Sequence, residues 1–169
     1  MIQDTLIYEY ENSFFIIQRG QQGKNPNTTA HQRASENTAL FSQLSISCSY
    51  EELGNATIGV LEHFDTIPPQ YDPWETKELN KLLYSWVGAK NYKTLERNSR
   101  LVQVIRNQNN IEIIPFDNYN KYKWYAPMSP EDGYKSKIIK LALDVSSSDI
   151  GKSIFKVFEF ATYNPEKKE

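Results

Sequence analysis

The chain has 169 residues, 39% of them hydrophobic and 13% aromatic, and carries a formal net charge of −2, which fits one folded domain over residues 1–169 and argues against disorder. No apolar run approaches the roughly 20 residues that span a bilayer, and the first residues lack the pattern of a secretory signal. The single cysteine excludes an internal disulfide and fits a reducing cytoplasm, and together with two histidines it is too little for a usual structural zinc site.

Two strands are predicted at the start of the chain, over residues 4–10 (DTLIYEY) and 14–18 (FFIIQ), joined by a turn. Residues 35–43 (SENTALFSQ) are expected to form a short or irregular connection. In residues 44–48 (LSISC) larger apolar side chains alternate with smaller ones, which is the period of a strand.

A helix is predicted to begin after Ser49, which has the capping-box spacing with Glu52. Apolar positions then recur on one helix face as far as residue 64. Two prolines follow, and Asp72 is predicted to cap a second helix over residues 73–87, which Gly88 ends.

The second half begins with a short turn of helix within residues 91–99. Residues 101–106 and 111–115 are predicted to pair as a hairpin around NQNN. Residues 116–127 (FDNYNKYKWYAP) are expected to be an edge strand or an ordered loop, and residues 129–133 a turn.

The strand, cap and helix of residues 44–64 recur at residues 141–160 with an offset of 97 and no gaps. Residues 141–145 (LALDV) repeat the strand period, and Ser146 with Asp149 repeats the capping box. The apolar positions of the two helices also match. The repeat predicts two related halves around one sheet, whereas chance similarity between two ordinary amphipathic units is the alternative.

The repeat also predicts the role of single residues. Gly54 and Gly151 fall in the first turn of each helix, where glycine costs about 1 kcal/mol relative to alanine, so we expect another backbone to pack closely there. Cys48 and His63 align with a valine and a phenylalanine. Cys48 is therefore interpreted as a small core hydrophobe, and His63 as part of a helix end.

The charge is distributed unevenly along the chain. Residues 50–80 hold seven carboxylates and one lysine, a balance of −6, whereas residues 81–109 have a balance of +5. Either two solvated faces neutralise each other in the fold, or an acidic surface awaits a basic partner.

Catalytic and ligand-binding motifs are lacking: no phosphate-binding loop, dinucleotide fingerprint, zinc-protease motif or nucleophile elbow occurs. His31 lies in a polar, loop-like stretch, where a solvated histidine is more usual than a general base. Residues 119–125 interleave lysines with aromatic side chains, as single-stranded nucleic-acid binders do. An aromatic strand that covers the core explains the same residues, and the acidic overall charge favours it.

Three segments resemble, in their order and spacing, the contact-dependent growth inhibition (CDI) immunity proteins of the CdiI family, whose members carry two Ser-x-x-x-hydrophobic-Gly helices. The segments are residues 49–64, 88–115 and 146–160. The resemblance implies a cytoplasmic, non-enzymatic inhibitor that binds the C-terminal toxin domain of a cognate CdiA effector. It implies no cofactor, metal, membrane, small-molecule substrate or direct nucleic-acid partner. The toxin domains that these immunity proteins bind are often nucleases.

The toxin-binding surface is predicted from physical chemistry, because the family motifs are cap, glycine and core positions. A nuclease needs a basic cleft for phosphates, and an inhibitor that blocks it gains association rate and specificity from carboxylates and anchoring from Tyr and Trp. The predicted surface consists of Asp65, Tyr71, Asp72, Trp74, Glu75 and Glu78. The alternative is that Trp74 only seals the core beside the helix cap.

The sequence as a whole predicts one α+β domain with a largely antiparallel sheet, on which the two repeated helices and the 73–87 helix pack. It predicts an immunity protein that blocks the active site of a toxin, with an RNase favoured. A small single-stranded nucleic-acid binding module that uses residues 119–125 is the alternative, and an enzyme based on His31 is a third possibility.

Overall fold

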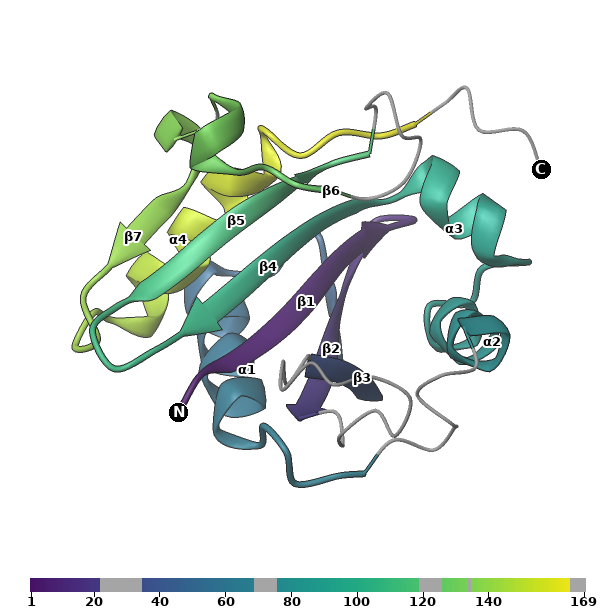
Figure 1. Cartoon of the computed structure of the whole chain (residues 1–169), viewed down its shortest axis with the longest axis horizontal. Coiled ribbons are helices and arrows are strands. Elements are labelled where there is room, and N and C mark those ends of the chain that lie inside the picture. Colours follow the sequence, from purple (N-terminus) through teal and green to yellow (C-terminus); the bar gives the residue numbers. More distant parts are fainter. Residues whose placement is uncertain (22–34, 69–75, 119–125, 134, 165–169) are drawn as a thin grey trace, which may run out of the picture.

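The computed structural model describes the chain except residues 22–34, 69–75, 119–125, 134 and 165–169 (Figure 1). The fold is α+β, as predicted: within the described residues an antiparallel sheet of seven strands carries four α-helices. The strands are β1 (Gln3–Tyr10), β2 (Ser13–Gln21), β3 (Ser35–Ser45), β4 (Arg100–Arg106), β5 (Ile111–Asp117), β6 (Ala126–Pro127) and β7 (Ile139–Leu141). The helices are α1 (Tyr50–Glu62), α2 (Thr76–Trp86), α3 (Tyr92–Asn98) and α4 (Ser147–Phe158), with 3₁₀ turns at Pro130–Asp132 and Lys135–Lys137.

The strands follow the order β3-β2-β1-β4-β5, and β6 and β7 both pair with the far side of β5. The predicted hairpins are confirmed. Glu11 and Asn12 join β1 to β2 with φ of 44° and 62°, the left-handed values that a tight hairpin turn requires. Between β4 and β5 the side-chain oxygen of Asn107 accepts from the backbone N–H of Asn109 and Asn110, which closes the turn.

The prediction for residues 35–43 is wrong, because they lie in β3, an 11-residue strand at the edge of the sheet. Its pairing with β2 shifts register between Ile16 and Ile17 and again between Gln18 and Arg19. Such irregular edge strands tolerate the polar residues that hid the strand in the sequence.

The strands predicted over residues 44–48 and 141–145 are also mostly wrong, since β3 ends at Ser45 and β7 at Leu141. In both places the chain turns: the N–H of Cys48 donates to the carbonyl of Ser45, and the N–H of Val145 donates to the carbonyl of Ala142. Ile46, Cys48 and Val145 pack against the core from these turns, whereas Leu143 is 47% exposed.

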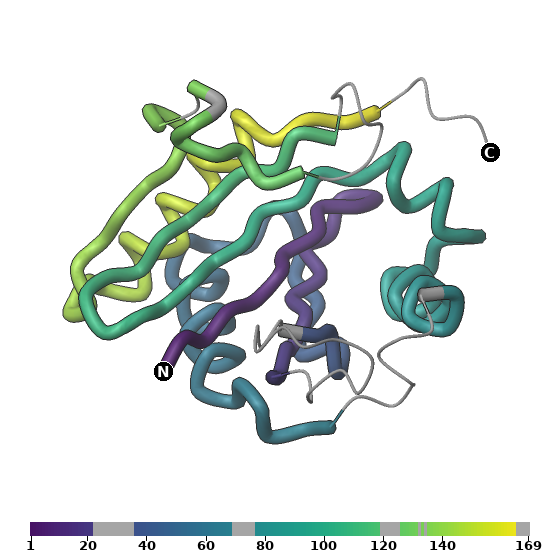
Figure 2. The backbone as a smooth tube through the Cα atoms, viewed as in Figure 1, coloured from purple at the N-terminus to yellow at the C-terminus, as the bar shows by residue number. Residues whose placement is uncertain are grey.

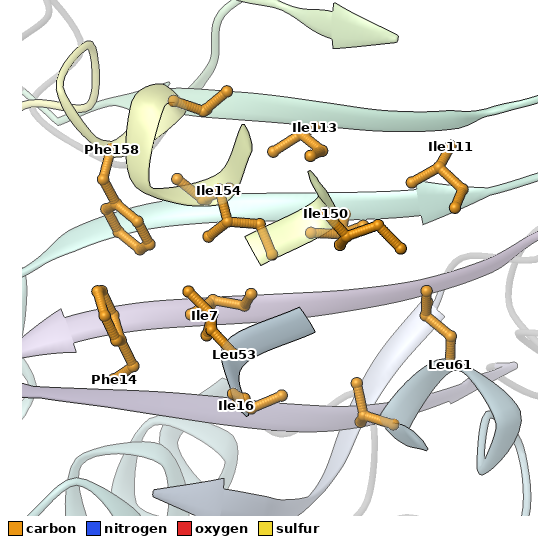
Figure 3. Close-up of a cluster of buried hydrophobic side chains, with 14 of the residues drawn as sticks. Ile7, Phe14, Ile16, Leu53, Leu61, Ile111, Ile113, Ile150, Ile154 and Phe158 are labelled. Atoms are coloured by element: carbon orange, nitrogen blue, oxygen red, sulfur yellow. The ribbon is translucent and has the colours of Figure 1, made fainter. Parts of the chain in front are cut away.

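One core lies between the sheet and the pair α1 and α4 (Figure 3). Strands contribute alternate residues such as Ile7, Ile16 and Ile113, which point to the same face because side chains of a strand alternate. The two helices bury equivalent positions against them. Those pairs are Leu53 and Ile150, Thr57 and Ile154, Val60 and Val157, and Leu61 and Phe158.

A second core fills the opposite face, beneath α2 and α3. Leu6, Tyr8 and Ile17 point to this side from β1 and β2, and Leu83 and Leu95 meet them from the helices. α2 ends as predicted at Gly88, whose φ of 75° suits glycine, and the following N–H reaches back to the carbonyl of Tyr84. The tube in Figure 2 shows α2 and α3 to one side of the strands and α1 and α4 behind them.

The cap and helix parts of the predicted repeat have closely matching geometry. Ser49 and Glu52 form a full capping box, whereas Asp149 bonds to the Ser146 hydroxyl rather than to its backbone N–H. The difference follows from the shorter side chain of Asp. That the two units are related halves stays a prediction.

The close backbone approach expected at the two glycines is present, and it is reciprocal. A Cβ on Gly54 would lie 1.7 Å from the carbonyl oxygen of Ser147, and a Cβ on Gly151 would lie 1.9 Å from that of Tyr50. Each glycine therefore meets the first residue of the other helix, and α1 and α4 cross where neither has a side chain.

Burial of phenol groups makes the stability of the fold sensitive to alkaline pH. Burial raises the pKa of Tyr8 and Tyr92, and burial with the hydrogen bond to Glu9 raises that of Tyr163. Above pH ~10 the unfolded chain loses phenol protons that the folded chain keeps, so the free energy of unfolding should fall by up to about 1.4 kcal/mol per pH unit for each of the well-buried Tyr8 and Tyr92. The exposed Tyr163 should contribute much less, because water screens its ring. Denaturant titrations at increasing pH should show this fall, and Tyr92→Phe should make it shallower; an unchanged slope would contradict this reading.

Candidate protein-binding surface

The longest stretch without a basic residue passes through α1. Residues 34–76 contain no Lys or Arg and seven Asp and Glu. Within it Glu51 and Glu62 are exposed and lie 11 positions apart, about three helical turns, so they share one side of α1. The toxin-binding surface predicted from the sequence does not include Glu51 and Glu62. Their positions on the polar side of an amphipathic helix could have been deduced from the sequence.

α4 provides an internal comparison for these two glutamates. At the repeat offset, Glu51 and Glu62 align with Ser148 and Glu159, and α4 also exposes Lys152 and Lys156. A helix with a serine N-cap, the same crossing and equivalent buried positions therefore exists in this fold with two lysines on its exposed side. The negative charge of α1 is not a requirement of its packing.

Two other carboxylates of this region are held by the backbone. Glu52 accepts from the N–H of Ser49 at 2.7 Å, and this bond lowers its pKa. Asp65 has a φ of 64°, donates its N–H to the carbonyl of Arg19, and accepts from the N–H of Gln21 at 3.0 Å. Both carboxylates are therefore held in a defined place at the ends of α1.

The predicted surface is only partly described by the structure. Four of its residues, Tyr71, Asp72, Trp74 and Glu75, lie outside the described residues. Asp65 and Glu78 are both exposed, but Asp65 follows α1, which packs on one face of the sheet, and Glu78 lies in α2, which packs on the other.

The surroundings of Glu78 also differ from the prediction. Lys77 and Lys81 stand on either side of it, and all three residues line one hollow on α2 and the start of α3. The exposed side of α2 is therefore not acidic. The described residues favour α1 and Asp65 as the acidic surface.

The reactive side chains within the described residues have structural explanations. Cys48 is half-buried beside the first core, and burial, with the charge of Glu52, raises the pKa of its thiol, which disfavours a nucleophilic thiolate. His63 ends α1, where its Nδ1 lies 2.8 Å from the carbonyl oxygen of Gly59. The prediction for His63 is confirmed, whereas Cys48 packs against the core without being part of its buried set, and His31 lies outside the described residues.

Two hollows of similar size open on the described surface. One, of about 460 Å³, lies beside β5, β6 and β7 and is lined mainly by apolar side chains such as Ile114, Met128 and Ile138. The other, of about 490 Å³, is lined by Lys77, Glu78, Asn80, Lys81, Tyr84 and Tyr92. Among their described lining residues there is no His or Cys, the side chains that acid–base or nucleophilic catalysis most often uses.

The described part of the chain also lacks two other kinds of feature. Its His, Cys, Asp and Glu side chains form no group of three that could hold a metal ion. Among its helices, none has the length and apolar character that crossing a bilayer demands.

Comparison with known proteins finds relatives by structure and by family model. No curated protein sequence matches the chain. Among the solved structures that share its fold are the following two. A protein of unknown function from Neisseria meningitidis, NMB0488, has a TM-score of 0.64 at 15% identity over 96% of both chains. A chain from the CdiA-CT/CdiI toxin and immunity complex of Yersinia pseudotuberculosis has a TM-score of 0.68 at 14% identity over 96% of this chain and 98% of that one.

The family model "CdiI: CDI immunity protein" matches residues 28–161, which is most of the chain. The match includes the capped helices, the glycine crossing and the β4–β5 hairpin, and thus the segments on which the sequence resemblance depended. The chain therefore belongs to the CdiI family of CDI immunity proteins.

Proposed function

We propose that the protein binds the C-terminal toxin domain of a cognate CdiA effector in the cytoplasm and neutralises it by covering its active site. The whole chain, residues 1–169, acts as one inhibitor domain and performs no chemistry of its own. Membership of the CdiI family supports this function, as does the fold shared with a chain from a toxin and immunity complex.

The acidic side of α1 is the observation that best supports binding to a basic active-site groove. It presents Glu51, Glu62 and the tethered Asp65 in a stretch of 43 residues, 34–76, without one Lys or Arg. Such a surface complements the basic groove in which a nuclease holds phosphates. We therefore favour a nuclease, and among nucleases an RNase, as the toxin.

Co-expression tests the function directly. The toxin domain encoded beside this gene should stop growth when produced alone, and growth should return when this protein is produced with it. The purified protein should show no nuclease activity. Growth arrest that persists with both proteins present would reject the proposed pairing.

Charge reversal tests the surface. The double variant Glu51→Lys/Glu62→Lys should lower toxin affinity at least tenfold, mainly through slower association, because it turns attraction into repulsion. Reversal of Asp72, Glu75 and Glu78 tests the surface predicted from the sequence in the same way. Binding kinetics at several salt concentrations would measure both.

A matched control is available at the two ends of α4, just outside the helix. Asp144→Lys/Glu159→Lys makes the same change of charge at two exposed positions outside the acidic stretch and should leave affinity nearly unchanged. If the α1 variant bound toxin as tightly as this control, the proposed surface would be discarded and the family assignment would remain.

A further inference from the structure

The hollow on α2 and α3 is lined by lysine, tyrosine and asparagine side chains, which are the kinds that bind nucleotides in proteins. Its volume of about 490 Å³ lies within the usual range of ligand pockets, roughly 300–1,000 Å³. Lys77 and Lys81 stand one turn apart on α2 and are exposed, while Tyr84 and Tyr92 are half-buried. Asn80, between the lysines, offers both amide donors and a carbonyl acceptor.

The segment of chain that carries this hollow has a positive net charge, although Glu78 lines the hollow and Glu96 lies near Tyr92. Residues 76–98 hold five basic and two acidic side chains, and all five basic ones are exposed. They are Lys77, Lys81, Lys90, Lys93 and Arg97. An anionic ligand is therefore favoured here, on the face of the sheet opposite to the acidic α1.

We propose that the α2–α3 hollow binds a nucleotide, either free or as one unit of a single-stranded RNA, with its phosphate at Lys77 and Lys81 and its base on Tyr84 or Tyr92. Aromatic faces stack on any base, and paired lysines meet phosphate without sequence preference. Asn80 contacts the base edge, whereas Glu78 repels the phosphate and limits affinity. This activity lies beyond toxin binding and contradicts the expectation of no direct nucleic-acid partner.

Titration of the full chain with three probes tests the proposal: uridine, uridine 5′-monophosphate and a uridine hexanucleotide. At low salt the phosphate-bearing probes should bind and uridine should not. If the monophosphate binds, a free nucleotide is enough to occupy the hollow. If only the hexanucleotide binds, the ligand is a single-stranded RNA. Absence of binding by both phosphate-bearing probes would overturn the proposal.

Variants of the hollow locate the site. Lys77→Ala/Lys81→Ala should lower hexanucleotide affinity at least tenfold and reduce the slope of log affinity against log salt by about 1.4, for two lost phosphate contacts. Tyr84→Leu should weaken binding roughly five- to hundredfold with an unchanged salt slope, because stacking is lost and charge is not. The lysines are exposed, so their removal should leave the circular dichroism spectrum unchanged.

The control uses the same chemistry on the other face. Lys152→Ala/Lys156→Ala removes two exposed lysines at the same spacing on α4 and should not change binding. If this control lost as much hexanucleotide affinity, the loss would reflect only the net charge of the protein, and the proposed site would be wrong. Glu78→Gln should tighten nucleotide binding, and a weaker or equal affinity would contradict the assigned position of the phosphate.

Discussion

Replacing Gly54 with alanine should destabilise the fold by roughly 3–5 kcal/mol, which is a large part of the free energy of unfolding of an ordinary domain. The added Cβ would lie 1.7 Å from the carbonyl oxygen of Ser147, a backbone atom that cannot move without moving α4. Gly151→Ala should have a similar effect, because its Cβ would lie 1.9 Å from the carbonyl oxygen of Tyr50.

The reciprocal contact also predicts how the two changes combine. Once one alanine has forced α1 and α4 apart, the second methyl group meets less resistance. The double variant should therefore lose less stability than the sum of the single variants, as expected for neighbours that share one contact. Urea denaturation of the three variants would measure this coupling.

Gly59→Ala is the control for the Gly54 variant, since it is the same change in the same helix. There the Cβ would lie 3.3 Å from the ring of Phe41, which is the end of a side chain and can shift. Alanine also favours a helix over glycine by about 1 kcal/mol, so this variant should be nearly neutral or slightly stabilising. Equal losses for Gly54→Ala and Gly59→Ala would contradict the tight crossing.

The second large effect is expected at Arg100, a residue of β4 that links the segment around Phe158 and Tyr163 to Glu9 of β1. Its guanidinium bonds to the carboxylate of Glu9 and to the carbonyl of Phe158, and it lies 5.0 Å from the centre of the Tyr163 ring. The Tyr163 hydroxyl donates to the other oxygen of Glu9 at 2.9 Å. Glu9 has its side chain only 8% exposed, so these partners take the place of water around its carboxylate.

Arg100→Ala should cost about 3 kcal/mol, because it leaves a buried carboxylate without its cation. Tyr163→Phe should cost only about 1 kcal/mol, since it removes one hydrogen bond and leaves the ion pair. Denaturant unfolding of both variants measures the difference. An Arg100→Ala loss no larger than that of Tyr163→Phe would show that the ion pair adds nothing.

An exposed ion pair serves as the control for this comparison. Lys140 and Glu112 lie 2.9 Å apart, with side chains 60% and 24% exposed. Lys140→Ala should cost less than about 0.5 kcal/mol, because water screens the pair.

Elements governed by neighbours in the sequence were predictable. Both serine caps, the Asn107 turn and the end of α2 at Gly88 depend on contacts within a few residues. The glycine crossing is a tertiary contact, and it was predicted only because two copies of one pattern could be compared.

Two features of the sheet could not be predicted from the sequence, because they depend on pairing with distant strands. β3 is polar and irregular, and only its pairing with β2 makes it a strand. Residues 46–48 and 142–145 have a strand period, but no neighbouring strand pairs with them in the described sheet. For the candidate surface, the sequence located the acidic region and could not show that Asp65 and Glu78 belong to opposite faces.

The sequence by itself determined the family, through its resemblance to the immunity proteins. It also determined the α+β class, the capped helices and the hairpins, since these follow from periodicity and from hydrogen bonds between near neighbours. The tertiary structure alone decided which face of the sheet each helix covers and which charges share a surface. It also brought Glu9 to Tyr163, a pair 154 positions apart in the chain. Such contacts depend on how strands pair across the sheet, and a local pattern carries no record of that pairing.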